Sequence, residues 1–319
     1  MYSDGASKIQ ARSPDVKETM MPMQHPAPVA LFVYNRPEST IRCVNSLKSS
    51  PIAKFTDLHI FSDNARIDSD VEKVALVRDF IKRVDGFASV SIHLQETNIG
   101  LAGSLISGTT AVIQQYGRVI VVEDDLVVSV NFLEFMNRAL EFYEGDENIL
   151  SVSGYSGIEL NPSDGVYFSL RASSWGWATW RDRWMAVDWA APEAESDLAS
   201  RQFRRNFSRG GADLPRMLQS WVDGRIDSWA IRFVYHQAKR GLVSVVPNVS
   251  KVINKGFGDS ATHTKMRKAG RTPRLDDMDV DAFQFRHFDG CEEETLRKFR
   301  EEYSIWNRLL VRIRVILAI

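Results

Sequence analysis

The stretch GRVIVVEDDLVV, residues 117–128, constrains the fold of this chain more than any other segment. Its β-branched run at 119–122 is typical of a buried strand, and three acids, Glu123, Asp124 and Asp125, follow without a break. Adjacent carboxylates at the end of a strand repel one another, so we expect a positive group nearby to compensate them.

A divalent cation is one group that could compensate these acids. Hard oxygen ligands suit Mg²⁺ or Mn²⁺, which commonly take one or two carboxylates from a protein together with the phosphates of a substrate. Open α/β sheets bind ligands at the carboxyl ends of their strands. The alternative is that the acids precede the helix predicted at NFLEFMNRALEFY, whose macrodipole favours negative charge at its N-terminus. The residues alone leave both interpretations open.

Segments before the three acids alternate between strand and helix patterns. Such alternation predicts a mostly parallel sheet with flanking helices, the α/β class, and a nucleotide-binding type of architecture over about residues 28–155. Neither GxGxxG nor GxxxxGK[ST] occurs there, which argues against dinucleotide and P-loop chemistry. We expect a first strand within residues 28–37 that stops at a turn, and strands at residues 58–61 and 89–94. We expect helices at residues 37–47, at 70–84 and after the segment TNIGLAGS.

The segment TNIGLAGS has two interpretations. Asn98 and Gly100 could bring amide and backbone groups close to a ligand, because glycine permits close approach. The segment could equally be a plain connection from strand to helix, with Gly100 for the turn.

Composition narrows the class of protein. The chain has 319 residues, 44% of them hydrophobic, which is enough for a large core. Its 40 basic and 41 acidic residues give no global field that indicates nucleic acid as a partner. Two cysteines make neither a disulfide framework nor a zinc site.

Residues 1–27 are predicted to be a disordered polar tail without a signal peptide. No apolar run has membrane-spanning length, so we expect a cytoplasmic protein.

The second half, residues 156–290, is predicted to bind an acceptor. Trp175, Trp177, Trp180 and Trp184 gather around a glycine. Indole faces stack on sugars and bases, so one of these side chains could form a wall of the acceptor pocket. The alternative is an ordinary buried aromatic cluster.

The last segment, residues 291–319, is predicted to contain an amphipathic helix. Apolar residues recur there every three or four positions, with Arg308, Arg312 and Arg314 between them. Packing on its own domain or on a second copy in a homo-oligomer is one expectation. Peripheral contact with the inner face of an anionic membrane is another.

The order of these segments resembles the metal-dependent GT-A glycosyltransferases, most closely the N-acetylglucosaminyltransferase I family (glycosyltransferase family 13) and its bacterial relatives. The resemblance covers about residues 28–265, and the acidic segment is its specific part. It implies a GT-A (Rossmann-like) fold and transfer of a sugar from a nucleotide-diphosphate donor, with a UDP-sugar favoured, to a hydroxyl of a glycan or other acceptor. The bacterial relatives suggest polysaccharide biosynthesis. The matching segments are LFVYNRPE, IFSDNAR, VIVVEDDLVVSVNFLEF, SVSGYSG, SSWGWATWRDRW, IDSWAIR and PNVSKVINKGFGDSATH.

The resemblance also implies roles for individual residues. Arg36 and Asp63 would contact the nucleotide, while Glu123 and Asp124 would hold the ribose and the donor sugar. Asp125 would bind Mn²⁺ or Mg²⁺ directly.

Residues from later segments complete the predicted site. Asp227 matches the general base of the family, although Ser228 stands where a second acid is common. A single base that deprotonates an acceptor hydroxyl, which then attacks in line with the leaving group, predicts inversion at the anomeric carbon. His263 matches a histidine that faces the diphosphate or the metal, and we place Trp177 with Asn98 and Gly100 among the residues that contact the donor.

Two alternatives to a glycosyltransferase remain open. A nucleotidyltransferase also places acids after a strand to hold metal, but YNRPEST lacks the glycines and the lysine of that class. A catalytically silent scaffold that binds a sugar or a nucleotide could keep the same fold, although the acids at 123–125 and 227 favour an enzyme.

Overall fold

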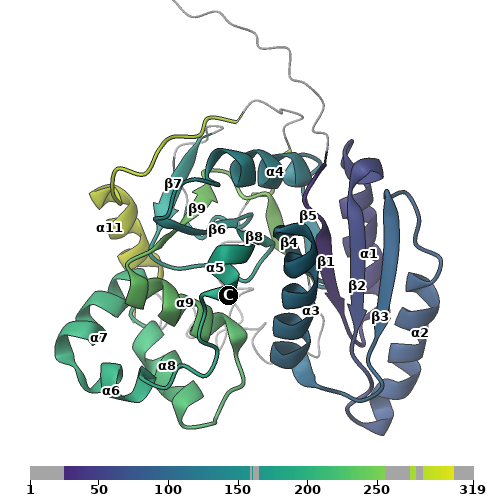
Figure 1. Ribbon diagram of the computed structural model, residues 1–319, viewed down its shortest axis with the longest axis horizontal. Coiled ribbons are helices and arrows are strands. Elements are labelled where there is room, and N and C mark those ends of the chain that lie inside the picture. The colour runs from purple at the N-terminus through teal and green to yellow at the C-terminus, as the bar shows by residue number, and fades with distance from the viewer. Residues whose placement is uncertain (1–24, 159, 161–164, 256–273, 278–282, 305–319) are drawn as a thin grey trace, which may run out of the picture.

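The computed structural model describes residues 25–158, 160, 165–255, 274–277 and 283–304. In this part of the chain eight strands form one mixed sheet in the order β3-β2-β1-β4-β8-β6-β9-β7. Helices cover both faces of the sheet, as the predicted α/β class requires (Figure 1). The strands are β1 (Val29–Val33), β2 (Asp57–Ser62), β3 (Ser89–Leu94), β4 (Arg118–Glu123), β6 (Ile149–Ser153), β7 (Val166–Ser169), β8 (Trp177–Trp180) and β9 (Val243–Pro247).

The first half follows the predicted alternation. Strands β3, β2, β1 and β4 are mutually parallel, so their carboxyl ends share one edge of the sheet. The third strand coincides with the predicted residues 89–94. The helices that connect these strands are α1 (Pro37–Lys48), α2 (Val71–Ile81) and α3 (Gly100–Tyr116).

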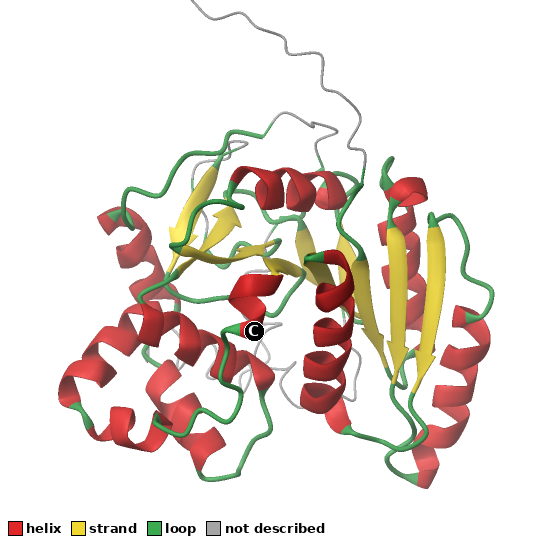
Figure 2. Ribbon diagram, in the orientation of Figure 1, coloured by secondary structure: helices red, strands yellow, loops and turns green. Residues whose placement is uncertain are grey.

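The two faces of the sheet pack into separate cores because side chains alternate along each strand. Val29, Leu31 and Val33 of β1 face a core with α1, α2 and α4 (Phe132–Phe142), whereas Ala30 and Phe32 face a core with α3 and with later helices. Figure 2 shows these helices on either side of the strands. The later helices are α5 (Arg181–Met185), α6 (Ala194–Ala199), α7 (Arg201–Phe207), α8 (Leu214–Val222) and α9 (Trp229–Arg240).

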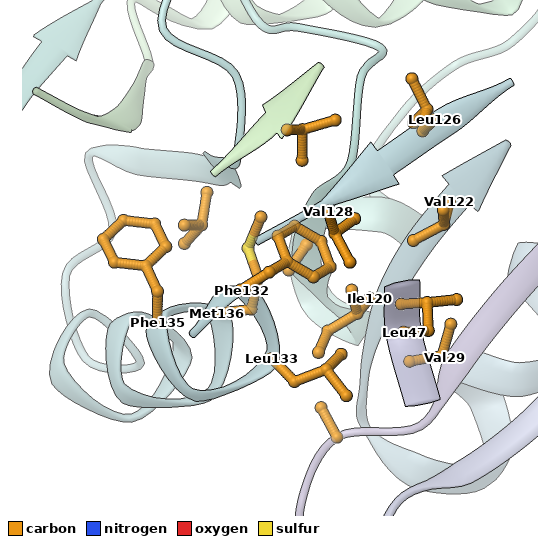
Figure 3. Close-up of a cluster of buried hydrophobic side chains, with 14 of the residues drawn as sticks. Val29, Leu47, Ile120, Val122, Leu126, Val128, Phe132, Leu133, Phe135 and Met136 are labelled. Atoms are coloured by element: carbon orange, nitrogen blue, oxygen red, sulfur yellow. The ribbon is translucent and has the colours of Figure 1, made fainter. Parts of the chain in front are cut away.

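A short two-stranded ribbon follows the three acids. Strand β5 (Leu126–Val128) pairs antiparallel with β10 (Val252–Asn254), and the Asn131 that caps α4 comes only after β5. The alternative that the acids lie at the N-terminus of that helix is therefore wrong. Figure 3 shows the apolar face of α4 packed against side chains of β4 and β5.

The two predicted halves share one sheet. Strand β8 lies between β4 and β6 and runs antiparallel to both, so that Val121, Trp177 and Ser153 lie abreast. The central position of β8 buries its side chains. Trp177, Trp180 and Trp184 are each at most 2% exposed, as an ordinary aromatic core requires.

The ends of the chain differ from the expectations in part. Ala27 is buried and donates its N–H to Asn137 Oδ1 at 2.7 Å, so this residue of the predicted tail packs against the domain. Helix α11 (Glu293–Glu302) buries Leu296 and Phe299 on its own domain. Residues 1–24 and 305–319, which include Arg308, Arg312 and Arg314, lie outside the described residues. No helix of the described ranges combines the length and apolar character needed to cross a bilayer.

Two glycines of α3 allow a test of the packing between this helix and the sheet. A Cβ at buried Gly108 would lie 2.8 Å from Phe32 and 2.9 Å from Phe61, whereas a Cβ at exposed Gly103 would meet only Ile99, at 3.7 Å or more. We predict that Gly108→Ala lowers the free energy of unfolding by about 1–3 kcal/mol through overpacking. Gly103→Ala should raise it by about 0.5–1 kcal/mol through helix propensity.

Urea unfolding of both variants measures the contrast. Equal effects of the two substitutions would contradict the close approach of α3 to Phe32 and Phe61.

Candidate functional site

A cavity of about 410 Å³ lies where the carboxyl ends of β1, β2 and β4 meet the start of α3. The parallel strands bring their terminal loops together there, as the sequence predicts. Its lining includes seven of the predicted site residues, namely Arg36, Asp63, Asn98, Gly100, Glu123, Asp124 and Asp125, together with Phe32, Val33, Tyr34, Asn35, Arg66, Leu101 and Ser104.

The three acids are crowded and short of positive partners. Asp125 Oδ2 lies 3.2 Å from Arg36 Nη1, and Asp124 Oδ2 accepts the backbone N–H of Tyr34 at 3.1 Å. Burial raises the pKa of Glu123 to about 8 and that of Asp124 to about 7, and the neighbouring carboxylates add to both shifts. Arg36 opposes the shifts without removing them. Ionisation of Glu123 and Asp124 is therefore unfavourable in the folded protein.

These carboxylates fit a hard cation in charge and in ligand type. Among the residues that the structure describes, no three His, Cys, Asp or Glu side chains converge to hold a metal. A cation at Asp125 would therefore need further oxygens, which the phosphates of a bound nucleotide can supply. This division of ligands is common for Mg²⁺.

The main chain also holds the acids in place. Lys255 N–H donates to the carbonyl oxygen of Asp125 at 2.8 Å, and Asp124 N–H donates to that of Phe32 at 3.0 Å. The Cys43 thiol contacts the carbonyl oxygen of Glu123 at 3.5 Å. The positions of the carboxylates are thus set by β1, α1 and the β5–β10 ribbon.

Asp63 anchors the start of α3 as well as lining the cavity. Its Oδ1 accepts the N–H of Ile99 at 3.1 Å and its Oδ2 accepts that of Gly100 at 2.9 Å. A carboxylate at a helix N-terminus satisfies free N–H groups and the macrodipole. Asn98 is held nearby, because its Nδ2 donates to the carbonyl oxygen of Asn64 at 2.6 Å.

Seven residues of the lining were not predicted as site residues: Phe32, Val33, Tyr34, Asn35, Arg66, Leu101 and Ser104. Tyr34 Oη donates to Asp70 at 2.8 Å and accepts the N–H of Arg66 at 2.9 Å. The position of Tyr34 directly after the first strand was a usable signal. Asp70 belongs to a different segment, and no local pattern indicates its contact with Tyr34.

Two predicted residues of the described ranges, Asp227 and Trp177, are not among the residues that line this cavity. The Asp227 side chain is 69% exposed and lies 3.5 Å from Arg232 Nη2, while Ser228, and not Asp227, caps α9. Trp177 is 1% exposed and stacks on Trp184 and Trp229, which removes it from the set that contacts the donor. His263 lies outside the described residues.

The raised pKa values predict a pH-dependent stability in metal-free protein. A carboxyl group whose pKa is higher in the folded state binds more protons there, so the free energy of unfolding falls as pH rises from about 5 to 8, by at most about 1.4 kcal/mol per pH unit for one group. Glu123→Gln removes this titration. The variant should therefore gain stability relative to the wild type at pH 8 but not at pH 5.

Urea unfolding in EDTA at several pH values measures this difference. Glu72→Gln, at an exposed position of α2, serves as the control. If the difference in the free energy of unfolding between Glu123→Gln and wild type stays constant from pH 5 to 8, the pKa of Glu123 is not raised in the folded protein and the prediction is wrong.

Comparison with known proteins gives similarity to solved structures alone, since no family model and no curated protein matches the sequence. Residues 1–349 of S. aureus TarS match at 10% identity with a TM-score of 0.38, covering 69% of this chain and 58% of that one. The same region in complex with UDP-GlcNAc matches at 12% identity with a TM-score of 0.29, covering 40% of this chain and 33% of that one. The mannosyltransferase PcManGT from Pyrobaculum calidifontis, in complex with GDP-Man and Mn²⁺, matches at 10% identity with a TM-score of 0.39. The match covers 67% of this chain and 69% of that one. The chain spans less than three fifths of the length of these TarS structures.

Proposed function

We propose that this chain is a metal-dependent, inverting glycosyltransferase. It would move a sugar from a nucleotide-diphosphate donor, with a UDP-sugar preferred, to a hydroxyl of a glycan or other acceptor. The observation that carries the proposal is the cavity itself, which gathers the acids 123–125, Arg36 and the start of α3 at one edge of the sheet. Its volume of about 410 Å³ lies within the range of roughly 300–1,000 Å³ that is typical of small-molecule sites.

The lining offers different chemistry to the two parts of such a donor. Tyr34 and Asn98 present an aromatic ring and an amide, which suit a nucleoside. Gly100 lines the cavity with a φ of +75°, a left-handed backbone conformation that glycine adopts without strain. We assign the pyrophosphate to the part lined by Arg36 and Asp125.

Asp125 would hold the metal ion. Bound there, Mn²⁺ or Mg²⁺ would neutralise the departing diphosphate and orient it, while Glu123 and Asp124 would contact the ribose and the donor sugar. In the structure Arg36 pairs with Asp125. With the metal at Asp125, the guanidinium of Arg36 would instead donate to phosphate oxygens, which it can bind through two hydrogen bonds. The crowded carboxylates would thereby gain the positive charge that the protein supplies only in part.

We assign the general base to Asp227. The acceptor hydroxyl must lose a proton as it attacks, and a carboxylate opposite the leaving group yields inversion. Asp227 is exposed on the segment before α9, and the first turn of that helix, at Ala230 and Ile231, borders a second cavity. An acceptor bound in that second cavity would lie close to the assigned base.

A nucleotide-binding scaffold without transfer is the second candidate. The exposure of Asp227 outside the acidic cavity favours it. A screen of UDP- and GDP-sugars with Mn²⁺, read as released nucleotide, separates the two functions. An enzyme releases nucleotide from at least one donor, whereas a scaffold binds donors and leaves them intact.

Replacement of Asp125 tests the metal assignment. We predict that Asp125→Asn lowers Mn²⁺-dependent release of nucleotide by about 100-fold or more, because a metal ligand is lost. Stability should change by less than about 1 kcal/mol, since the ion pair with Arg36 is partly exposed. Asp85→Asn, which removes a surface partner of Lys48, is the matched control. Activity equal to wild type in Asp125→Asn would remove Asp125 from the metal site.

Replacement of Asp227 tests the base. Asp227→Asn should leave the affinity for the donor unchanged in calorimetry and lower transfer by roughly 10²- to 10⁴-fold, the usual contribution of a general base. Asp223→Asn, on the same surface segment and paired with Arg225, is the control. Unchanged transfer in Asp227→Asn would exclude this residue as the base.

A further inference from the structure

We propose that a second cavity, of about 160 Å³, binds one neutral pyranose ring of the acceptor. The inference rests on the proposed function and names the chemistry of its second substrate. The cavity lies between the loops that follow β6 and precede β8, with α8, α9 and α11 completing its walls. Its volume is well above the roughly 10–15 Å³ that a single water needs, so the cavity can admit a small polar molecule such as one sugar ring.

Aromatic rings form part of the wall. Tyr155 and Trp175 meet edge to face at 4.4 Å, and Tyr303 stacks on Phe299 at 5.4 Å. All four residues line the cavity. Flat aromatic surfaces pack well against the apolar faces of sugar rings, and the polar tips of Tyr and Trp can bond to hydroxyls.

The polar groups of the wall indicate a neutral ligand. Arg171 donates to both oxygens of Asp213, at 2.8 and 3.2 Å, and its guanidinium lies 4.6 Å from the ring of Tyr303. This bidentate pairing cancels the charge of Arg171, so the cavity offers no net positive charge to an anion. Ser173 and Ser174 add hydroxyl groups to the lining. Hydroxyl-rich, uncharged molecules fit this combination.

The sheet register places this cavity beside the acids. Val121, Trp177 and Ser153 lie abreast on neighbouring strands. Strands β4 and β6 run in the same direction because both are antiparallel to β8. Two residues further toward the carboxyl ends of β4 and β6, the corresponding positions on the three strands are Glu123, Trp175 and Tyr155. Strands are about 4.8 Å apart, so β4 and β6 lie roughly 10 Å apart.

Hydrogen bonds also tie the two cavities together. Gly154 N–H donates to the carbonyl oxygen of Gly176 at 2.6 Å, and Lys251 N–H donates to that of Gly154 at 2.7 Å. Lys251 leads into β10, whose partner β5 follows the acids. The wall of the second cavity and the backbone of the acids thus belong to one connected unit.

Saturation-transfer NMR on the full chain, without donor or metal, tests the inference. The probes are the methyl glycosides of glucose, galactose and mannose, and N-acetylglucosamine. We expect at least one probe to bind, and Trp175→Ala or Tyr155→Ala to weaken its binding about tenfold through lost stacking. Trp175→Phe should retain most of it, and Phe55→Ala, a 54% exposed aromatic of the first half, should have no effect.

The unfolding midpoint of each variant shows whether it is folded. Absence of binding by every probe, or unchanged binding in a folded Trp175→Ala or Tyr155→Ala variant, would overturn the inference. The proposed function fails separately, if wild-type protein releases no nucleotide from any donor with Mn²⁺. The two failures are distinguishable because the NMR experiment contains neither donor nor metal.

Discussion

Repulsion among three consecutive carboxylates at the end of β4 is the constraint around which this molecule is arranged. Arg36 pairs with Asp125, yet burial still raises the pKa of Glu123 to about 8 and that of Asp124 to about 7. Carboxyl groups with raised pKa values destabilise the folded state once they ionise. Functional sites commonly hold such perturbed groups, and a bound cation would remove the cost.

The sheet explains how one edge serves both proposed substrates. Parallel strands β1, β2 and β4 deliver Arg36, Asp63 and the acids to one cavity. The antiparallel strand β8 then turns the tryptophan-rich segment back to the same edge, so that its loop at Trp175 borders the second cavity. A mixed sheet thus places the proposed donor site and the proposed acceptor site side by side.

Much of this arrangement follows from local sequence patterns. Periodicity defines β3 at residues 89–94 and the helices of the first half, because side chains alternate with a fixed period in each element. The gathering of Arg36, Asp63, Asn98 and Asp125 in one cavity follows from the shared carboxyl edge of parallel strands. Contacts between distant segments are not encoded locally, and the expectations differ from the structure there. Trp177 is buried because β8 lies in the middle of the sheet, and β5 forms only because β10 pairs with it from 124 residues later.

The central claim is that the acids of β4 share a cation with a diphosphate. Electron paramagnetic resonance of Mn²⁺ with the full chain, titrated in the absence and in the presence of saturating UDP, tests it most directly. If protein and nucleotide share one ion, UDP must tighten Mn²⁺ binding, and Mn²⁺ must tighten UDP binding by the same factor, because coupling between sites is reciprocal. A Mn²⁺ affinity that UDP leaves unchanged would contradict the account.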